Sequence, residues 1–421
     1  MMAPTSITLI ILLFAVVMFV WERIPLALTS MLVCVALVLT GVLDAHEAFS
    51  GFINKNVVLF VDMFIIGAAL FETGMAKQIG GIVTKFAKTE KQLVVATMTI
   101  TGLMSGLLSN TGTAAVLIPV VVGLAAKSGF SRSKLLMPVV FAAAMGGNLS
   151  LIGAPGNMIA QSALEEVNLG FSFFEYAYVG LPMLIIGTLF IATFGYKYLP
   201  NTNASNKHEE DEIDYSHIPN WKKYTSLVVL TITILAMVFE KQIGIPLHIS
   251  GAIGALILPI VGVINEQQVY RSIDMKTIFL FGGTLGLAQA MQKTGAGEQI
   301  ATSVLNSLGS HASMFLIMFV IFMLAVVLTN FMSNTATTAL LVPIGMSISM
   351  SIGADPRAVM MAVVIGGSLA YATPIGMPAN AMVLGPGGFK FSDYMKSGLP
   401  LIVVSTIVSM ILLPILYPFF H

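Results

Sequence analysis

Long apolar runs, separated by short polar segments, make up most of this chain. The clearest runs cover residues 7–20, 24–42, 176–196, 226–239, 248–264, 312–328 and 400–417. Their lengths approach the ~20 residues that an α-helix needs to cross the hydrocarbon core of a bilayer. The pattern therefore predicts an all-α, polytopic membrane protein.

Two of the apolar regions are interrupted by the same polar tripeptide. Ser109-Asn110-Thr111 and Ser333-Asn334-Thr335 are each followed, at the same interval, by a proline. A break in the backbone is unfavourable in hydrocarbon unless it lines a cavity or packs inside protein. We therefore expect both tripeptides to lie at a site inside the protein.

The next apolar stretch after each tripeptide is interrupted as well. The segments "GGNLSLIGAPGN" (146–157) and "GGSLAYATPIGMPAN" (366–380) both concentrate glycine and proline within an apolar region. Glycine and proline destabilise a continuous helix, and the freed carbonyl groups of an unwound membrane segment can coordinate a small cation. The sequence predicts two broken helices beside the two tripeptides.

The two halves of the chain align with each other. The stretch from Ile24, "IPLALTSMLVCVALVLTGVL", matches the stretch from Ile245, "IPLHISGAIGALILPIVGVI". The alignment continues through Phe60 with Phe281, through both tripeptides, and to Asn157 with Asn380. The chain is predicted to be an internal duplication, with repeats at residues 1–199 and 224–421 and a polar, cytoplasmic linker at residues 200–223.

Positive charge distinguishes the two repeats. The first repeat has basic residues on both sides of its tripeptide: Lys77, Lys85, Lys88, Lys91, Lys127, Arg132 and Lys134. The matched positions of the second repeat have none: Glu298, Asn306, Gly309, Ala312, Ser351, Pro356 and Ala358. Because cytoplasmic loops are enriched in lysine and arginine, both flanks of the first tripeptide are predicted to be cytoplasmic, and both flanks of the second to be outside.

A segment with both ends on one side of the membrane is a re-entrant hairpin. The predicted hairpins cover about 92–127, entering from the cytoplasm, and about 312–350, entering from outside. Each repeat then holds five transmembrane helices and one hairpin. An odd number of spans inverts the second copy, so the prediction is a pair of inverted repeats.

Composition narrows the classes of function. The chain is 57% hydrophobic and 10% charged with no net charge, so its charge gives no indication that it binds nucleic acid. The hairpins contain no carboxylate, base or metal-binding cluster at their tripeptides, which argues against an enzyme and against a proton relay. Two opposed hairpins favour alternating access over an ion channel. A neutral, oxygen-rich site suits sodium together with an anion.

The paired tripeptides and the stretch "SLAYATPIGMPANAMV" (368–383) resemble the divalent anion/sodium symporter family, also called the sodium–dicarboxylate family. The resemblance implies a secondary active transporter of di- and tricarboxylates of the succinate, malate, fumarate and oxoglutarate class. It implies symport with Na+ at two or more sites, no organic cofactor, a homodimer and an elevator mechanism in the plasma membrane or inner membrane. Sodium-independent dicarboxylate exchange, and transport of sulfate or another inorganic oxyanion, are the alternatives.

The resemblance also assigns site residues. The first sodium site would use Ser105, Ser109, Asn110 and the backbone of Gly153. The second would use Thr329, Asn334 and the backbones of Met332 and Gly376. The carboxylate-binding residues would be Asn110, Thr111, Asn334, Thr335 and Pro378, together with Ala154 and Met377.

The last two positions depart from the family. Ala154 and Met377 stand where dicarboxylate members commonly have threonine. Each replacement removes a hydroxyl group beside the expected substrate, which bears on the choice of anion more than on the fold.

Overall fold

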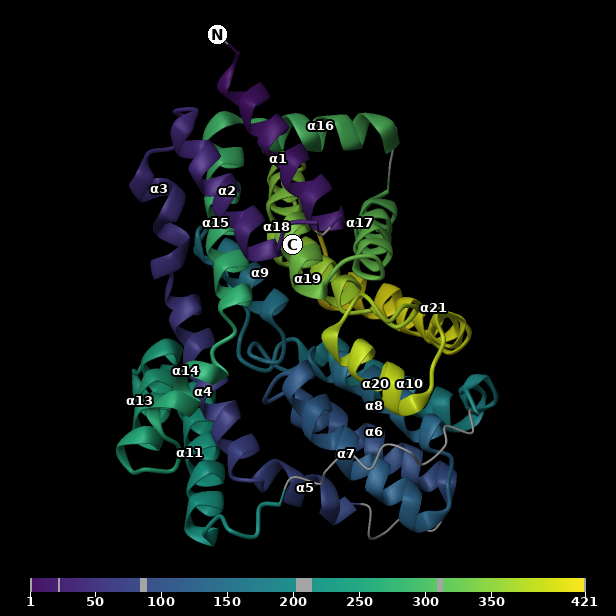
Figure 1. The fold of residues 1–421 in the computed structure, drawn as a ribbon. Helices are drawn as coiled ribbons and strands as arrows, with labels where there is room; N and C mark the ends of the chain where they lie inside the picture. Colours follow the sequence, from purple (N-terminus) through teal and green to yellow (C-terminus); the bar gives the residue numbers. More distant parts are fainter. Residues whose placement is uncertain (1, 22, 84–88, 202–213, 309–312, 420–421) are drawn as a thin grey trace.

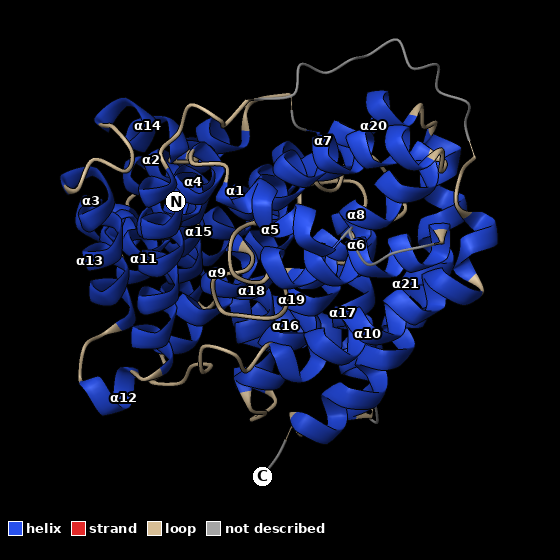
Figure 2. Ribbon diagram, turned by 90° about the horizontal axis from the view of Figure 1, so that it is seen from below, coloured by secondary structure: helices blue, strands red, loops and turns tan. Residues whose placement is uncertain are grey.

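The computed structural model describes residues 2–21, 23–83, 89–201, 214–308 and 313–419, and every regular element in these ranges is a helix (Figure 2). The all-α prediction is confirmed. The predicted linker at residues 200–223 lies partly outside the described residues, which omit 202–213. Its last four residues form the first turn of a helix that begins at Asn220.

The helices of the first half are α1 (Pro4–Trp21), α2 (Leu26–Leu39), α3 (Ala45–Phe49), α4 (Lys55–Glu72), α5 (Met75–Val83), α6 (Glu90–Ser105), α7 (Asn110–Ser128), α8 (Arg132–Gly146), α9 (Pro155–Glu165) and α10 (Ala177–Thr193). The helices of the second half are α11 (Asn220–Val238), α12 (Glu240–Ile243), α13 (Leu247–Ile260), α14 (Glu266–Ser272), α15 (Met275–Thr294), α16 (Ala296–Leu308), α17 (Met314–Thr329), α18 (Asn334–Ser351), α19 (Pro356–Gly367), α20 (Pro378–Gly387) and α21 (Phe391–Leu416). Short 3-10 turns follow α3 and α10.

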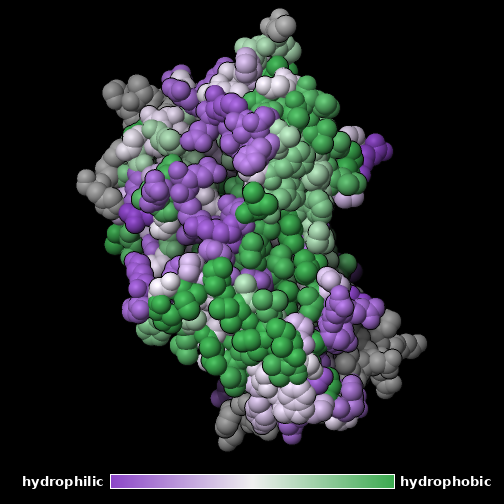
Figure 3. Space-filling view, turned by 90° about the vertical axis from the view of Figure 1, so that its left-hand side faces the viewer, coloured by the Kyte–Doolittle hydropathy of each residue, from purple (hydrophilic) through white to green (hydrophobic). Residues whose placement is uncertain are grey.

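Four helical stretches of the described residues are long and apolar enough to cross a membrane, namely Pro4–Trp21, Ala45–Glu72, Asn220–Val238 and Phe391–Leu416. Along α21, Leu399, Val403, Ile407, Ile411 and Ile415 are exposed at every fourth position, so they form one outward-facing stripe. Apolar side chains also form a broad continuous area on the face shown in Figure 3. Such a large exposed apolar area is what a lipid-facing surface requires.

The helices form two groups that lie side by side (Figure 1). In the first group α2 packs on α15 and α4 packs on α13 and α11; we call it the scaffold group. In the second group, the hairpin group, α6 packs on α8, α17 packs on α19, and α10 packs on α21. Helices α5 and α16 connect the two groups at opposite ends of the molecule (Figure 1). The hydropathy pattern did not predict these two connecting helices.

Both predicted interruptions after the tripeptides are present. α8 ends at Gly146 and α9 begins at Pro155, while α19 ends at Gly367 and α20 begins at Pro378. Proline suits the first position of a helix because it has no N–H to leave unsatisfied there. The two unwound segments also contact each other, since Nδ2 of Asn148 donates to Oγ of Ser368 at 2.5 Å.

The same hydrogen bonds stabilise both unwound segments. Nδ2 of Asn157 donates to the carbonyl oxygens of Gly147 and Ser150, at 2.8 and 2.7 Å. Nδ2 of Asn380 donates in the same way to Ala370 and Thr373, at 2.6 and 2.9 Å. Buried backbone groups must be paired, so each asparagine compensates for helical hydrogen bonds that the break removes.

Candidate functional site

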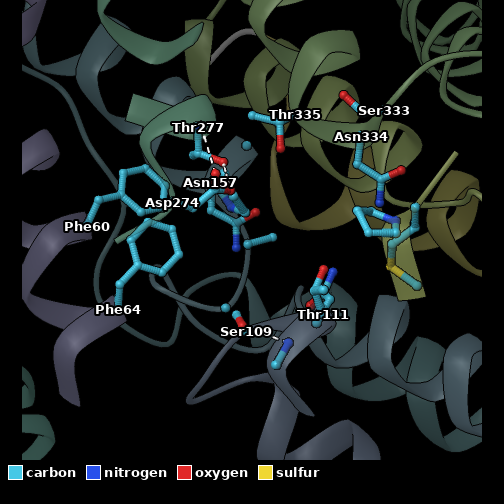
Figure 4. A pocket seen from close by; sticks show the side chains of 18 of the residues that line it. Phe60, Phe64, Ser109, Thr111, Asn157, Asp274, Thr277, Ser333, Asn334 and Thr335 are labelled. Atoms are coloured by element: carbon cyan, nitrogen blue, oxygen red, sulfur yellow. Dashed lines mark hydrogen bonds between the residues drawn. The ribbon is translucent and has the colours of Figure 1, made fainter. Parts of the chain in front are cut away.

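A cavity of about 440 Å³ lies between the two groups of helices. This volume falls within the ~300–1,000 Å³ typical of small-molecule sites. One wall comes from the two tripeptides and the two unwound segments, and the other from α4, α14 and α15. Figure 4 shows Phe60 and Phe64 of α4 on the opposite side of the cavity from Asn334. The fold thus brings four interrupted segments, far apart in sequence, to one cavity.

Four helix N-termini meet at this cavity. The residues that precede α7, α9, α18 and α20 all line it: Ser109, Ala154, Ser333 and Met377. The first backbone N–H groups of a helix lack partners within the helix, and the helix dipole adds partial positive charge there. Helix N-termini are therefore natural anion sites. Four N-termini around one cavity favour the binding of an anion there, although no arginine is among the described residues that line it.

The tripeptide serines cap two of these helices. Oγ of Ser109 accepts from the N–H of Gly112 at 3.1 Å, and Oγ of Ser333 accepts from the N–H of Ala336 at 3.2 Å. α9 and α20 have no such side-chain cap, because alanine and methionine precede them. Because Ala154 and Met377 have no hydroxyl group, no side-chain cap pairs with the backbone N–H groups at the N-termini of α9 and α20.

An oxygen cluster lies behind the first tripeptide. The buried hydroxyl of Ser105 contacts Oδ1 of Asn110 at 2.7 Å and the carbonyl oxygen of Ala143 at 2.6 Å. A hydroxyl has one proton, so it cannot donate to both oxygens at once. The carbonyl oxygen of Gly153 also faces the amide of Asn110. Two arrangements satisfy these oxygens: rotation of the Asn110 amide, which brings its nitrogen toward them, or a cation among them.

The second tripeptide has the same cluster. The buried hydroxyl of Thr329 contacts Oδ1 of Asn334 at 2.7 Å and the carbonyl oxygen of Gly367. The N–H of Asn334 donates to the carbonyl oxygen of Gly376 at 3.1 Å. Again the single proton of the hydroxyl group cannot be donated to both oxygens at once. Neutral side-chain and carbonyl oxygens are the ligands that transporters use for sodium.

Most of the residues assigned from the sequence lie at this site. The cavity-lining members are Ser109, Asn110, Thr111, Gly153, Ala154, Asn334, Thr335, Gly376, Met377 and Pro378. Ser105, Thr329 and Met332 are fully buried behind the tripeptides. Ser105 and Thr329 join the oxygen clusters, whereas the hydroxyl of Ser109 is used as a helix cap.

Two parts of the site were not predicted from the sequence. The carbonyl oxygens of Ala143 and Gly367 belong to the oxygen clusters, yet a backbone carbonyl has no residue-type signature. The scaffold wall was also missed; its members include Phe60, Met63, Phe64, Phe71, Asp274, Lys276, Thr277 and Leu280. No group of three or more His, Cys, Asp or Glu side chains that could hold a metal ion occurs in the described part of the chain.

A cavity at the meeting point of broken helices in an apolar, all-α protein is typical of membrane transporters. The chain belongs to the citrate transporter family, whose profile matches residues 16–366. A protein of this class is a transporter rather than an enzyme. The relatives of this chain confirm the similarity to sodium–dicarboxylate transporters that the tripeptides predict.

Several curated proteins are similar over most of their length. An uncharacterized transporter of Haemophilus influenzae is 28% identical, over 95% of this chain and 89% of that protein. The sodium-dependent dicarboxylate transporter SdcS of Staphylococcus aureus is 26% identical, over 92% of this chain and 81% of that protein. The sodium-dependent high-affinity dicarboxylate transporter 3 of Caenorhabditis elegans is 25% identical, over 88% of this chain and 76% of that protein.

The fold is also similar to solved structures. The YdaH transporter of Alcanivorax borkumensis has a TM-score of 0.66 at 17% identity, over 90% of this chain and 87% of that chain. The antimetabolite efflux pump MtrF of Neisseria gonorrhoeae has a TM-score of 0.63 at 15% identity, over 100% of this chain and 96% of that chain. At these identities the likeness concerns the fold alone.

Proposed function

We propose that this protein transports di- and tricarboxylates of the succinate, malate, fumarate and oxoglutarate class together with sodium. The observation that carries the proposal is the cavity on which four helix N-termini and two oxygen clusters converge. The N-termini suit carboxylate oxygens, and the clusters suit small cations. The names of the relatives from Staphylococcus aureus and Caenorhabditis elegans support this pairing of dicarboxylate with sodium.

The site residues have distinct roles in this proposal. Sodium binds at the first cluster, with Ser105, Asn110, Gly153 and Ala143, and at the second, with Thr329, Asn334, Gly367 and Gly376. Ser109, which also caps α7, and the backbone of Met332 complete the first and second sodium sites in this proposal. The anion binds between Thr111 and Thr335, with Pro378, Ala154 and Met377 around it.

Transport proceeds by alternating access in this proposal. The two repeats have inverted topology, the hairpin group moves as an elevator against the scaffold group, and two copies form a homodimer in the cell membrane. The matched hydrogen bonds of the two halves support the duplication: Tyr176 donates to the carbonyl oxygen of Asn157 at 3.0 Å, and Tyr394 donates to that of Asn380 at 2.5 Å.

Uptake into proteoliposomes tests the coupling. We expect succinate uptake to rise more than linearly with external sodium, because more than one cluster must be filled. If three or more sodium ions accompany one divalent anion, a negative interior will speed uptake, since each charge moved is worth ~2.3 kcal/mol per 100 mV. Uptake that ignores sodium and requires internal dicarboxylate would establish an exchanger. Preference for sulfate over every carboxylate would establish an oxyanion transporter.

Cysteine labelling tests the inverted topology. The background is Cys34→Ser, which removes the one native thiol, a buried one. Cysteines placed at Lys91 and Ser128, the two exposed ends of the first hairpin, are expected to react with an impermeant maleimide only from the cytoplasm. Cysteines at Ser313 and Ser351, the exposed ends of the second hairpin, are expected to react only from outside. Reaction of Lys91→Cys and Ser128→Cys from opposite faces would make the first hairpin a span and contradict the proposal.

A further inference from the structure

One lysine of the scaffold wall belongs to neither oxygen cluster. Lys276 lies in the first turn of α15, is exposed, and lines the cavity. A cation in the first turn of a helix is disfavoured by the helix dipole. No ion pair involving Lys276 occurs among the residues that the structure describes. A side chain that opposes its own helix and lacks a charged partner is the kind of local inconsistency that marks a functional position.

The nearby carboxylate of Asp274 is already used to cap α15. Its oxygens accept from the N–H groups of Lys276 and Thr277, at 3.1 and 3.4 Å, and from the Thr277 hydroxyl at 2.5 Å. Figure 4 shows Asp274 and Thr277 together at the cavity. The helix N-terminus and these donors compensate the negative charge of Asp274. The positive charge of Lys276 has no such compensation.

The equivalent lysine of the first half is paired. In the internal alignment Lys276 matches Lys55, the first residue of α4. Nζ of Lys55 lies 3.3 Å from Oε1 of Glu165 at the end of α9, a helix that packs on α18 and α19. The amide of Asn56 donates to Oε2 of the same glutamate at 2.8 Å. In the second half, the alignment of Asn157 with Asn380 puts Gly388 at the position of Glu165. The position that matches Glu165 in the second half therefore has no carboxylate to offer Lys276.

We propose that the transported anion supplies this carboxylate. With one carboxylate at the four helix N-termini, a divalent anion directs its second carboxylate across the cavity toward the ammonium group of Lys276. The inference rests on the proposed function and extends it, because it makes Lys276 the residue that distinguishes divalent from monovalent anions. The ammonium group also attracts anions into the cavity, since a charge in a cleft with apolar walls focuses the field.

Three variants test the inference: Lys276→Gln, Lys276→Arg, and Lys293→Gln as a control. Lys293 lies on the same helix but at its other end, where it pairs with Glu47 at the surface. For Lys276→Gln at low ionic strength we expect the KM for succinate to rise about tenfold, the lower end of the ~10–10³ range for focused charge, with kcat unchanged. Choline chloride at constant sodium should shrink this difference, because salt screens exposed charges. Lys276→Arg should restore the KM.

The valence of the anion provides a second readout. Monomethyl succinate has one carboxylate, so it gains only the long-range attraction, and its KM should rise in Lys276→Gln by much less than that of succinate. Without anion the Tm of Lys276→Gln should be no lower than that of the native protein, because the lost charge opposed the helix dipole. The rise in Tm on adding succinate should be smaller.

Three results would contradict these claims, and they can be told apart. If the native protein takes up succinate and Lys276→Gln has the same KM and salt dependence as Lys293→Gln, the inference alone is wrong. If the native protein takes up no divalent anion, the proposed function is wrong and the inference with it. If the native protein takes up sulfate instead, the KM for sulfate is measured in the native protein and in Lys276→Gln, with monomethyl succinate as the monovalent anion. Equal sulfate KM values in the two proteins again overturn the role of Lys276.

Discussion

Replacing Asn334 with aspartate is expected to reduce anion transport at least tenfold. The side chain lies at the cavity (Figure 4), and its Oδ1 already faces the hydroxyl of Thr329 at 2.7 Å. Aspartate keeps an oxygen for the cation cluster but replaces the amide donor with negative charge beside the anion. Like charges ~4 Å apart repel by about 1 kcal/mol in water and about 4 at an effective dielectric near 20. A factor of ten needs only ~1.4 kcal/mol.

The loss in Asn334→Asp would not come from unfolding. Asn334 is the first residue of α18, where a negative side chain is favourable for the helix. The Tm in detergent should therefore match or exceed that of the native protein, while initial rates of succinate uptake fall. Thr335→Ser is the matched control on the neighbouring position, since it keeps the hydroxyl group, and we expect its rates to stay close to native. Normal transport by Asn334→Asp would show that the tripeptides are not the binding site.

Replacing Gly376 with alanine is expected to weaken sodium-stimulated transport at least about tenfold. A Cβ at this position would lie closer than 3.0 Å to the carbonyl oxygen of Thr329 and 2.6 Å from Cβ of Ala370. Both neighbours are buried and one is backbone, so the unwound segment must move. Overpacking of this kind costs ~1–3 kcal/mol. The carbonyl oxygen of Gly376 holds the N–H of Asn334 at 3.1 Å, so the movement distorts the second oxygen cluster.

The measurement is the sodium dependence of succinate uptake. For Gly376→Ala we expect the half-maximal sodium concentration to rise, or the maximal rate to fall, by at least about tenfold, since ~1.4 kcal/mol is one decade. Gly385→Ala is the control in the neighbouring helix α20, because a Cβ there meets no atom within 4 Å. A native sodium curve for Gly376→Ala would contradict a cation site at this backbone.

The sequence contained enough information to predict where the helices break. Glycine, proline and serine act on the backbone within a few residues, so "GGNLSLIGAP" and "GGSLAYATPIGMP" marked the ends of α8 and α19 and the starts of α9 and α20. The apolar runs likewise predicted the all-α class, because the need to satisfy every backbone group in lipid leaves few alternatives. The repeated tripeptide identified the cavity wall that carries Asn110 and Asn334. Each of these effects is local in the chain.

Only the tertiary structure decided what these segments face. Phe60 and Lys276 belong to helices with no unusual motif, and they reach the cavity because α4 and α15 pack beside the hairpin group. The carbonyl oxygens of Ala143 and Gly367 join the clusters because the last turns of α8 and α19 pack beside the hydroxyl groups of Ser105 and Thr329. Every residue has a carbonyl oxygen, so no residue type reveals which ones converge. Hydropathy and backbone breaks thus determined the helices and one polar wall. The opposite wall and the carbonyl members of the two oxygen clusters depended on packing between segments far apart in the chain.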